Sequence, residues 1–118
     1  MSETTLYDTS GRATAYVATD GETIYLWNGR AVAYLVGDKV YSWSGRHLGW
    51  FLKGIVFDGR GRRCGFERGR TPFAVSASPA KSAKSARSAK SARSAAFARP
   101  ALSTGFSDLG LAEFLSQR

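Results

Sequence analysis

The chain has 118 residues, of which 43% are hydrophobic and 13% aromatic, and its formal net charge is +8. This length suits one small domain with a tail, and no stretch approaches the ~20 apolar residues of a membrane-spanning helix. The first residues lack the basic and apolar regions of a signal peptide, and a single cysteine, Cys64, excludes an intramolecular disulfide. We therefore expect a cytoplasmic protein, possible also at a membrane surface as a peripheral protein.

A short phrase recurs four times between residues 4 and 70. Each copy has an aliphatic residue, an aromatic residue, a turn that ends in Gly-Arg, a small residue and a second aromatic residue. The copies begin at Leu6, Ile24, Val40 and Val56. The glycines of their turns are Gly11, Gly29, Gly45 and Gly61. Repeats at a nearly fixed spacing indicate a fold that is built from like units.

Each copy has the pattern of a β-hairpin, because short β-branched and aromatic runs flank a turn. The Asn-Gly pair at residues 28–29 is the strongest turn signal. Such pairs favour two-residue type I′ turns, whose central residues both need positive φ. A two-residue turn would place Ile24 opposite Ala33 and Tyr25 opposite Val32. One face of the hairpin would then be aromatic and the other aliphatic, and a lone hairpin could bury neither.

Four such hairpins, with eight short strands, predict an all-β fold in which a shallow, barrel-like ring has approximate fourfold symmetry. Closure of the ring would remove exposed strand edges. One column of the repeat holds only small residues, namely Ala15, Ala33, Gly49 and Gly65. Either these residues converge near the barrel axis, where only small side chains fit, or they let the backbone approach a covering segment.

The phrase Tyr-x-Trp-x-Gly-Arg in Tyr25–Arg30 and Tyr41–Arg46, together with the period and the four copies, resembles the 4-fold β-flower proteins. The resemblance covers roughly residues 4–70. It implies the fold of small bacterial proteins built as a shallow fourfold barrel of hairpins. These proteins are related in structure to the tubby C-terminal-like group, which includes lipid-binding and scramblase-like members. The first copy, Tyr7–Arg12, also resembles the YD repeat of large toxin-encapsulating shells, which four copies could not build.

Catalysis has little support in the sequence. His47 is the single histidine, which excludes a histidine-based metal cluster, and no base is placed to activate Cys64. Most carboxylates of the repeat region lie in turns, where they serve turn geometry. We therefore expect a non-enzymatic binding module without a cofactor or a metal, which recognises a hydrophobic or anionic ligand such as a lipid or a peptide.

The arginine column and the tryptophans of the repeat are candidates for ligand binding. The arginine column would form a ring near one end of the barrel and could hold a phosphate headgroup or an acidic peptide terminus. The alternative is that each arginine stacks on the aromatic residue across its hairpin, as Trp27 over Arg30. Aromatic residues that stay exposed would add an apolar surface. The candidate residues are Arg12, Arg30, Arg46, Arg62, Trp27, Trp43 and Trp50.

Residues 76–100 have low complexity, with tandem Lys/Arg-Ser-Ala triplets from Lys81 to Ala95. Because large apolar residues are missing before Phe97, we expect a disordered basic linker. It could bind nucleic acid, which is the alternative function, or adhere to an anionic membrane surface, or serve as a spacer. The basic residues that would carry these contacts are Lys81, Lys84, Arg87, Lys90 and Arg93.

Residues 101–118 are predicted to form a short amphipathic helix with Ser107 as its N-cap. A helix of this length is not stable alone, so it should dock on its own barrel or on a partner protein. Its docking residues are Phe106, Leu111, Phe114 and Leu115. The predicted organisation is therefore a repeat domain over 1–75, a linker over 76–100 and a docking helix over 101–118, in a chain taken to be a monomer.

Overall fold

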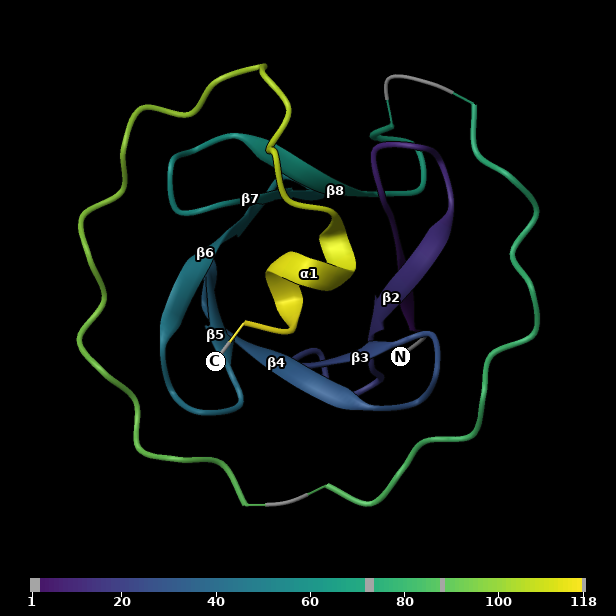
Figure 1. Ribbon diagram of the computed structural model, residues 1–118, viewed down its shortest axis with the longest axis horizontal. Coiled ribbons are helices and arrows are strands. Elements are labelled where there is room, and N and C mark those ends of the chain that lie inside the picture. Colours follow the sequence, from purple (N-terminus) through teal and green to yellow (C-terminus); the bar gives the residue numbers. More distant parts are fainter. Residues whose placement is uncertain (1–2, 72–73, 88, 118) are drawn as a thin grey trace.

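The computed structural model of the chain describes residues 3–71, 74–87 and 89–117. Among them, eight strands close into one antiparallel barrel in chain order, and β8 pairs with β1 (Figure 1). The predicted barrel of four hairpins is confirmed. The hairpins are β1 (Thr4–Tyr7) with β2 (Ala13–Val17), β3 (Thr23–Leu26) with β4 (Ala31–Val36), β5 (Lys39–Ser42) with β6 (His47–Leu52), and β7 (Ile55–Phe57) with β8 (Arg63–Glu67).

The turns within the hairpins have three residues, and the predicted two-residue turn at residues 28–29 is wrong. The N–H of Leu26 donates to the carbonyl of Arg30, and the N–H of Gly29 donates to the carbonyl of Leu26, both at 2.9 Å. Gly29 has a φ of +90°, so a type I turn is followed by a glycine in the left-handed region. The same pair of backbone bonds recurs in the other three turns.

This turn shifts the register of each hairpin by one residue. Ile24 lies opposite Ala33 as predicted, but Tyr25 lies opposite Ala31 and not Val32. A β-bulge absorbs the extra residue, and Val32 joins the interior cluster. The sequence could not decide between the two turns, because a glycine with positive φ is suitable for both.

The interior of the barrel is aliphatic. The first residue of each repeat lies opposite the small residue of the same hairpin, in the pairs Leu6–Ala15, Ile24–Ala33, Val40–Gly49 and Val56–Gly65. This core continues into α1 (Leu111–Leu115), whose Leu111, Phe114 and Leu115 are buried with it. The C-terminal helix therefore packs on its own barrel.

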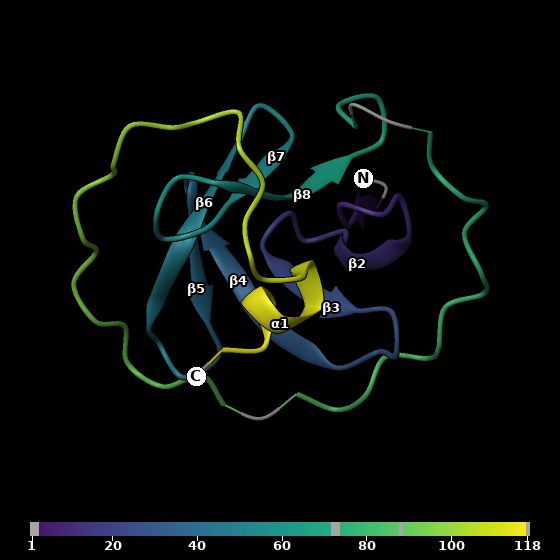
Figure 2. The same cartoon turned by 45° about the horizontal axis from the view of Figure 1, so that its top comes forward.

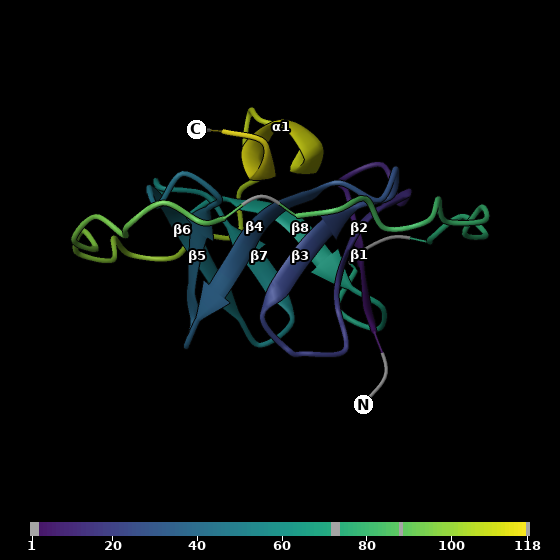
Figure 3. The same cartoon turned by 90° about the horizontal axis from the view of Figure 1, so that it is seen from below.

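The helix lies across one end of the barrel (Figures 2 and 3). A Cβ atom on Gly49 would lie 2.8 Å from the ring of Phe114, and one on Gly65 would lie 2.7 Å from Leu111. The glycines of the small-residue column thus make room for a covering segment. The helix begins after Gly110, which is its N-cap in place of the predicted Ser107.

The aromatic columns face outward, and their residues pair between neighbouring hairpins. The pairs are Tyr16–Tyr25, Tyr34–Tyr41, Trp50–Phe57 and Phe66–Tyr7. The first two pairs are stacked, with ring centroids 5.5 and 5.8 Å apart. All eight residues are nevertheless buried, because another segment of the chain covers them.

That segment is residues 74–87 and 89–110, here called the belt. It runs around the outside of the barrel before the chain reaches α1 (Figures 1 and 3). The sequence predicted a disordered linker over most of this segment, whereas the structure places its described residues along the barrel. Backbone hydrogen bonds of 2.8 to 3.0 Å join the belt to all four turns. The donors are the N–H groups of Ser76, Ser85, Ser94 and Ser103, and the acceptors are the carbonyls of Gly11, Gly29, Gly45 and Gly61.

The belt advances nine residues for each hairpin, as the donors at 76, 85, 94 and 103 show. Alanine carbonyls follow the same period, because Cβ atoms on the four turn glycines would lie 2.0 to 2.6 Å from the oxygens of Ala74, Ala83, Ala92 and Ala101. An Ala-x-Ser phrase every nine residues was therefore the sequence signal. The triplets concealed it, since they repeat the same phrase every three residues.

Candidate functional site

The four arginines of the repeat column directly follow the turn glycines, and all four are exposed. The turns within the hairpins lie at the barrel end where α1 sits (Figure 3). The centre of this end is occupied by α1, so the arginines do not surround one open site. Arg46 and Arg62 line one pocket, whereas Arg30 lines another and Arg12 belongs to neither. The fourfold column is thus divided by the helix into separate sites.

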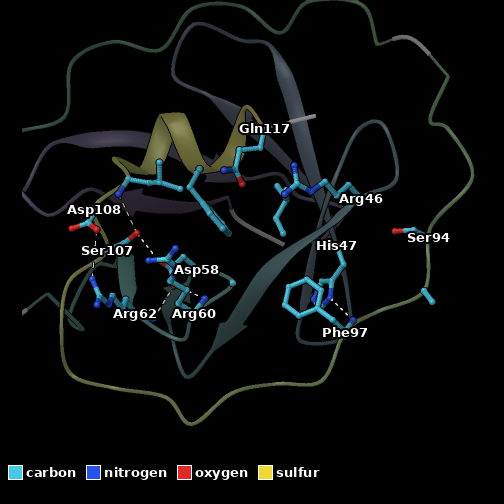
Figure 4. A pocket seen from close by; sticks show the side chains of 15 residues that line it. Arg46, His47, Asp58, Arg60, Arg62, Ser94, Phe97, Ser107, Asp108 and Gln117 are labelled. Atoms are coloured by element: carbon cyan, nitrogen blue, oxygen red, sulfur yellow. Dashed lines mark hydrogen bonds and ion pairs between the residues drawn. The ribbon is translucent and has the colours of Figure 1, made fainter.

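The pocket that contains two of these arginines has a volume of about 640 Å³ and lies between α1 and the turns of the third and fourth hairpins (Figure 4). We call it the arginine pocket. Arg46, Arg60 and Arg62 provide its cationic groups, while Phe97 of the belt and Phe114 of α1 provide apolar surface. The repeat column missed Arg60, although the extra Gly-Arg pair at residues 59–60 was visible in the fourth copy.

Two carboxylates share the arginine pocket. Asp58 is buried, and its Oδ1 accepts hydrogen bonds from the N–H groups of Arg60 and Arg62, each at 2.9 Å. Its Oδ2 accepts a 2.6 Å bond from the hydroxyl of Ser107, so this carboxylate is committed to the turn and the belt. Asp108 lies 3.6 Å from Nη1 of Arg62, and its side chain is 87% exposed. An ion pair this exposed contributes little stability.

His47 lies in the wall of the arginine pocket and fastens the belt (Figure 4). Its Nδ1 accepts a hydrogen bond from the N–H of Phe97 at 3.2 Å, so Nε2 carries the proton and donates to the carbonyl of Gly49 at 2.9 Å. Burial lowers the pKa of His47, and Lys39 lowers it further, against the opposing effects of the Gly49 carbonyl and Asp38. The neutral ring is therefore a structural anchor.

The profile of the family described as 4-fold beta flower protein matches residues 4–115. This match includes the belt and α1 as well as the barrel. The chain belongs to the 4-fold β-flower family. Comparisons with curated proteins and with solved structures gave no significant match. The family therefore accounts for the fold, and the site of this β-flower protein has to be interpreted from its own residues.

The stability of this β-flower protein is expected to fall as the pH drops below about 6.5, the ordinary pKa of histidine. Because the pKa of His47 is lowered in the folded state, the unfolded chain takes up the proton first. The contribution of His47 is complete above the unfolded pKa and is lost as the pH falls through the folded pKa. Urea unfolding between about pH 8 and pH 5 measures this, with His47→Gln as the comparison. Equal pH slopes for the two proteins would contradict the prediction.

The predicted basic residues of the belt lie against the barrel. Arg87 Nη1 is 3.1 Å from the hydroxyl of Thr23 and 4.0 Å from the carboxylate of Asp20. Burial acts to raise the pKa of Asp20, but hydrogen bonds from Thr23 and Glu22 outweigh it and lower the pKa to about 2. The remaining predicted cations lie over aromatic rings of the outer face, namely Lys81, Lys84, Lys90 and Arg93.

The predicted aromatic and helical residues fall into different environments. Trp50 is buried against His47 and Phe97, so it is part of the packed structure, whereas Trp27 and Trp43 are half-buried on the outer face. Phe106 precedes α1 and is 46% exposed, with the Arg63 guanidinium 4.7 Å above its ring. Leu111, Phe114 and Leu115 are buried in the barrel end.

We also searched the described residues for a metal site, a membrane-spanning helix and a reactive cysteine. They contain no group of three potential metal ligands, and none of their helices has the length and apolar character needed to cross a membrane. Cys64 is buried and its Sγ donates to the carbonyl of Val56 at 3.5 Å. Burial raises the pKa of the Cys64 thiol, which leaves it protonated and unreactive.

Proposed function

We propose that this β-flower protein is a non-enzymatic binding module that takes an anionic group in the arginine pocket. The observation that supports this is the placement of Arg46, Arg60 and Arg62 around one pocket with apolar surface beside them. Guanidinium groups bind phosphates and carboxylates through paired, charge-assisted hydrogen bonds. A lipid phosphate or the carboxylate of a peptide, each joined to an apolar chain, suits this combination.

Asp108 marks the position that such an anion would take. Its carboxylate is the internal partner of Arg62, and the high exposure of its side chain means that little burial opposes its displacement. Asp58 does not compete for ligand in this way, because both of its oxygens are occupied by turn and belt donors. An incoming anion would therefore replace Asp108 on Arg62 and gain further contacts from Arg46 and Arg60.

Inorganic phosphate, an acidic peptide and vesicles that contain phosphatidylserine are the probes that test this proposal. We expect Arg62→Gln and Arg46→Gln each to weaken binding of the preferred probe roughly tenfold, about the free energy of one charge-assisted hydrogen bond. Asp108→Asn is expected to strengthen it several-fold, because the internal competitor is removed. Arg12→Gln is the matched control, since Arg12 has the same place in its turn but lies outside the pocket. Isothermal titration and vesicle sedimentation provide the measurements.

The alternative, nucleic-acid binding through the belt, gives a different result in the same set of proteins. It predicts a gel shift with duplex DNA that the pocket variants do not change. That shift should decrease when Arg87 and Arg93, two of the predicted basic residues, are replaced by glutamine. Side-chain replacements test the alternative better than deletion of the basic segment does. Deletion would also remove the backbone hydrogen bonds that Ser85 and Ser94 donate to the turns. Unaltered anion binding in Arg62→Gln and Arg46→Gln would overturn the proposed pocket.

A further inference from the structure

Two corners of the outer barrel face carry aromatic clusters of the same design. In the first, which we call cage 1, Tyr16 and Tyr25 are stacked with centroids 5.5 Å apart and planes inclined by 12°. Trp27 stands at 86° to Tyr16 with the centroids 5.9 Å apart. The two ring directions provide a floor and a wall, which is the arrangement that aromatic cages use to hold organic cations.

Cage 2 repeats this geometry at the next corner. Tyr34 and Tyr41 are stacked with centroids 5.8 Å apart and planes inclined by 18°. Trp43 stands at 90° to Tyr34 at a centroid distance of 5.9 Å. Because the two cages come from different repeats and agree in every one of these values to within a few tenths of an ångström and a few degrees, the geometry is a property of the repeat.

Each cage holds a lysine ammonium group of the belt. Nζ of Lys81 lies 4.2 Å from the ring centroid of Tyr16 and 5.5 Å from that of Trp27. Nζ of Lys90 lies 4.3 and 5.3 Å from the corresponding rings of cage 2. The two lysines are nine residues apart, which is the belt's own period. A second belt cation lies over the other tyrosine of each cage, Lys84 at 5.3 Å from the Tyr25 centroid and Arg93 at 5.8 Å from the Tyr41 centroid. Only Lys81 and Lys90 lie between the tyrosine floor and the tryptophan wall, in register with the barrel.

The other two corners of the barrel lack both the tryptophan of the barrel and the lysine of the belt. The positions that correspond to the two tryptophans hold Thr9 and Gly59. At the corner of Gly59 the belt supplies Phe97, whose ring would lie 3.5 Å from a Cβ on that glycine. At the corner of Tyr7 and Phe66 it supplies Phe106. Among the described residues, a belt lysine thus lies over the rings where the barrel has a tryptophan, and a belt phenylalanine fills the corner where it has none.

The belt does not depend on these lysines for its position. At cage 1 the N–H groups of Ser82 and Ser85 donate to the carbonyls of Trp27 and Gly29 at 3.1 and 2.9 Å. The indole N–H of Trp27 also donates to the carbonyl of Pro79 at 3.0 Å. The Lys81 side chain is 32% exposed. Truncation of Lys81 would therefore vacate the space between the Tyr16 ring and Trp27, while Lys84 remains 5.3 Å from the Tyr25 centroid and the belt backbone stays in place.

We propose that both cages are binding sites for alkylammonium groups, with Lys81 and Lys90 as their built-in ligands. An ammonium group over an aromatic face is attracted by the negative potential of the ring, and quaternary ammonium ions are bound well because water holds them weakly. Glu3, which pairs with Lys81 and Lys84, adds a negative charge beside cage 1. The ligand in trans is a small quaternary ammonium ion or a lysine of a basic peptide, which share this chemistry.

The test uses the full chain with the cages vacated by Lys81→Ala and Lys90→Ala together. The probes are tetramethylammonium chloride, with sodium chloride at equal ionic strength as the reference, and a blocked peptide of residues 80–87. Binding moves the methyl proton signal of tetramethylammonium upfield by ring currents and changes the tryptophan fluorescence. We expect saturable binding of at least one probe, roughly tenfold tighter than to the unchanged protein, in which the internal lysines compete.

Further variants separate cage binding from general effects. Lys39→Ala removes a lysine outside the cages and should leave probe binding as in the unchanged protein. Trp27→Leu added to the vacated protein should abolish binding at cage 1 and keep it at cage 2. The pair Lys81→Gln and Lys90→Gln serves as a second vacated form that retains the aliphatic stems. A response to tetramethylammonium alone identifies small ammonium ions as the ligand, and a response to the peptide alone identifies lysine. Folded vacated proteins that respond to neither probe, or equally to sodium, would overturn the proposal, and this outcome is independent of the arginine pocket.

Discussion

Replacing Gly45 by alanine is expected to destabilise the protein by roughly 2–4 kcal/mol. Gly45 has a φ of +93°, a conformation that costs an L-residue about 1–2 kcal/mol. In addition, the new Cβ would lie 2.1 Å from the carbonyl oxygen of Ala92 in the belt. Backbone cannot move aside as a side chain can, so the belt must leave this turn and lose the 2.8 Å bond from Ser94 to Gly45. Urea unfolding measures the loss.

Gly69→Ala is the matched control for this substitution. Gly69 has nearly the same φ, +89°, but a Cβ there meets no atom within 4 Å. Its replacement therefore measures the conformational cost alone, and the excess for Gly45→Ala measures the contact with the belt. Limited trypsinolysis adds a second readout, because the basic residues of a released belt become substrates. Equal losses of stability and equal cleavage in the two variants would show that the belt does not rest on this turn.

Truncation of Phe114 to alanine is expected to cost about 3–5 kcal/mol, the usual range for a buried phenylalanine. Phe114 is 1% exposed and its ring fills the space that Gly49 leaves open. A helix of five residues has no stability of its own, so it depends on this contact to remain on the barrel. Urea unfolding should show the loss of stability.

Glu113→Gln tests whether the effect comes from apolar contact. Glu113 lies on the same helix but is exposed, and the substitution keeps the side-chain oxygen that accepts a 3.3 Å hydrogen bond from the N–H of Gly110. We expect this variant to stay within about 0.5 kcal/mol of the unchanged protein. If Phe114→Ala and Glu113→Gln were equally stable, the helix would contribute nothing to the barrel core.

The barrel could be predicted from the sequence because a closed ring of four hairpins needs the same residue types at equivalent positions of each hairpin. The predicted pairing of Ile24 with Ala33 is confirmed, and the equivalent pairs recur in the other three hairpins. Which face of the hairpins lies inside was left open by the sequence, and the structure places the aliphatic face there. The turn was mispredicted for a local reason. A glycine in the left-handed region fits a two-residue turn and also a three-residue turn with a bulge, and only the strand register distinguishes them.

The sequence predicted a disordered linker in place of most of the belt, because the contacts that hold the belt do not require a particular composition. Its backbone donates to the turns, the described serine and alanine side chains between residues 74 and 103 are exposed, and its lysines lie over aromatic rings of the outer face. The part of the belt before Phe97 has no large apolar residue, and such a segment is normally disordered, since it cannot bury enough surface to order itself. Here the binding partner is the repeat pattern of the same chain, which composition alone does not reveal.

The arginine column predicted a ring of four guanidinium groups near one barrel end. The four arginines follow equivalent turns in the structure, but only Arg46 and Arg62 line the same pocket. The position of α1 separates the arginines of the column, and it determines the pocket that Arg60 also lines. The pairing of Arg62 with Asp108 depends on it as well. Repeat symmetry cannot predict these features, because the helix occurs once and breaks the symmetry of the four hairpins.

The contacts of the belt with the barrel repeat every nine residues, whereas the sequence of its middle part repeats every three. Three Lys/Arg-Ser-Ala units span one hairpin, so sliding the middle of the belt by three residues would bring another serine to the same glycine and another cation to the same rings. The triplets alone therefore do not determine the register of the belt on the barrel. Two contacts outside the triplets determine it, the hydrogen bond from Trp27 to the Pro79 carbonyl and the one from Phe97 to His47. These two contacts have to form before the segment between them adopts its final register.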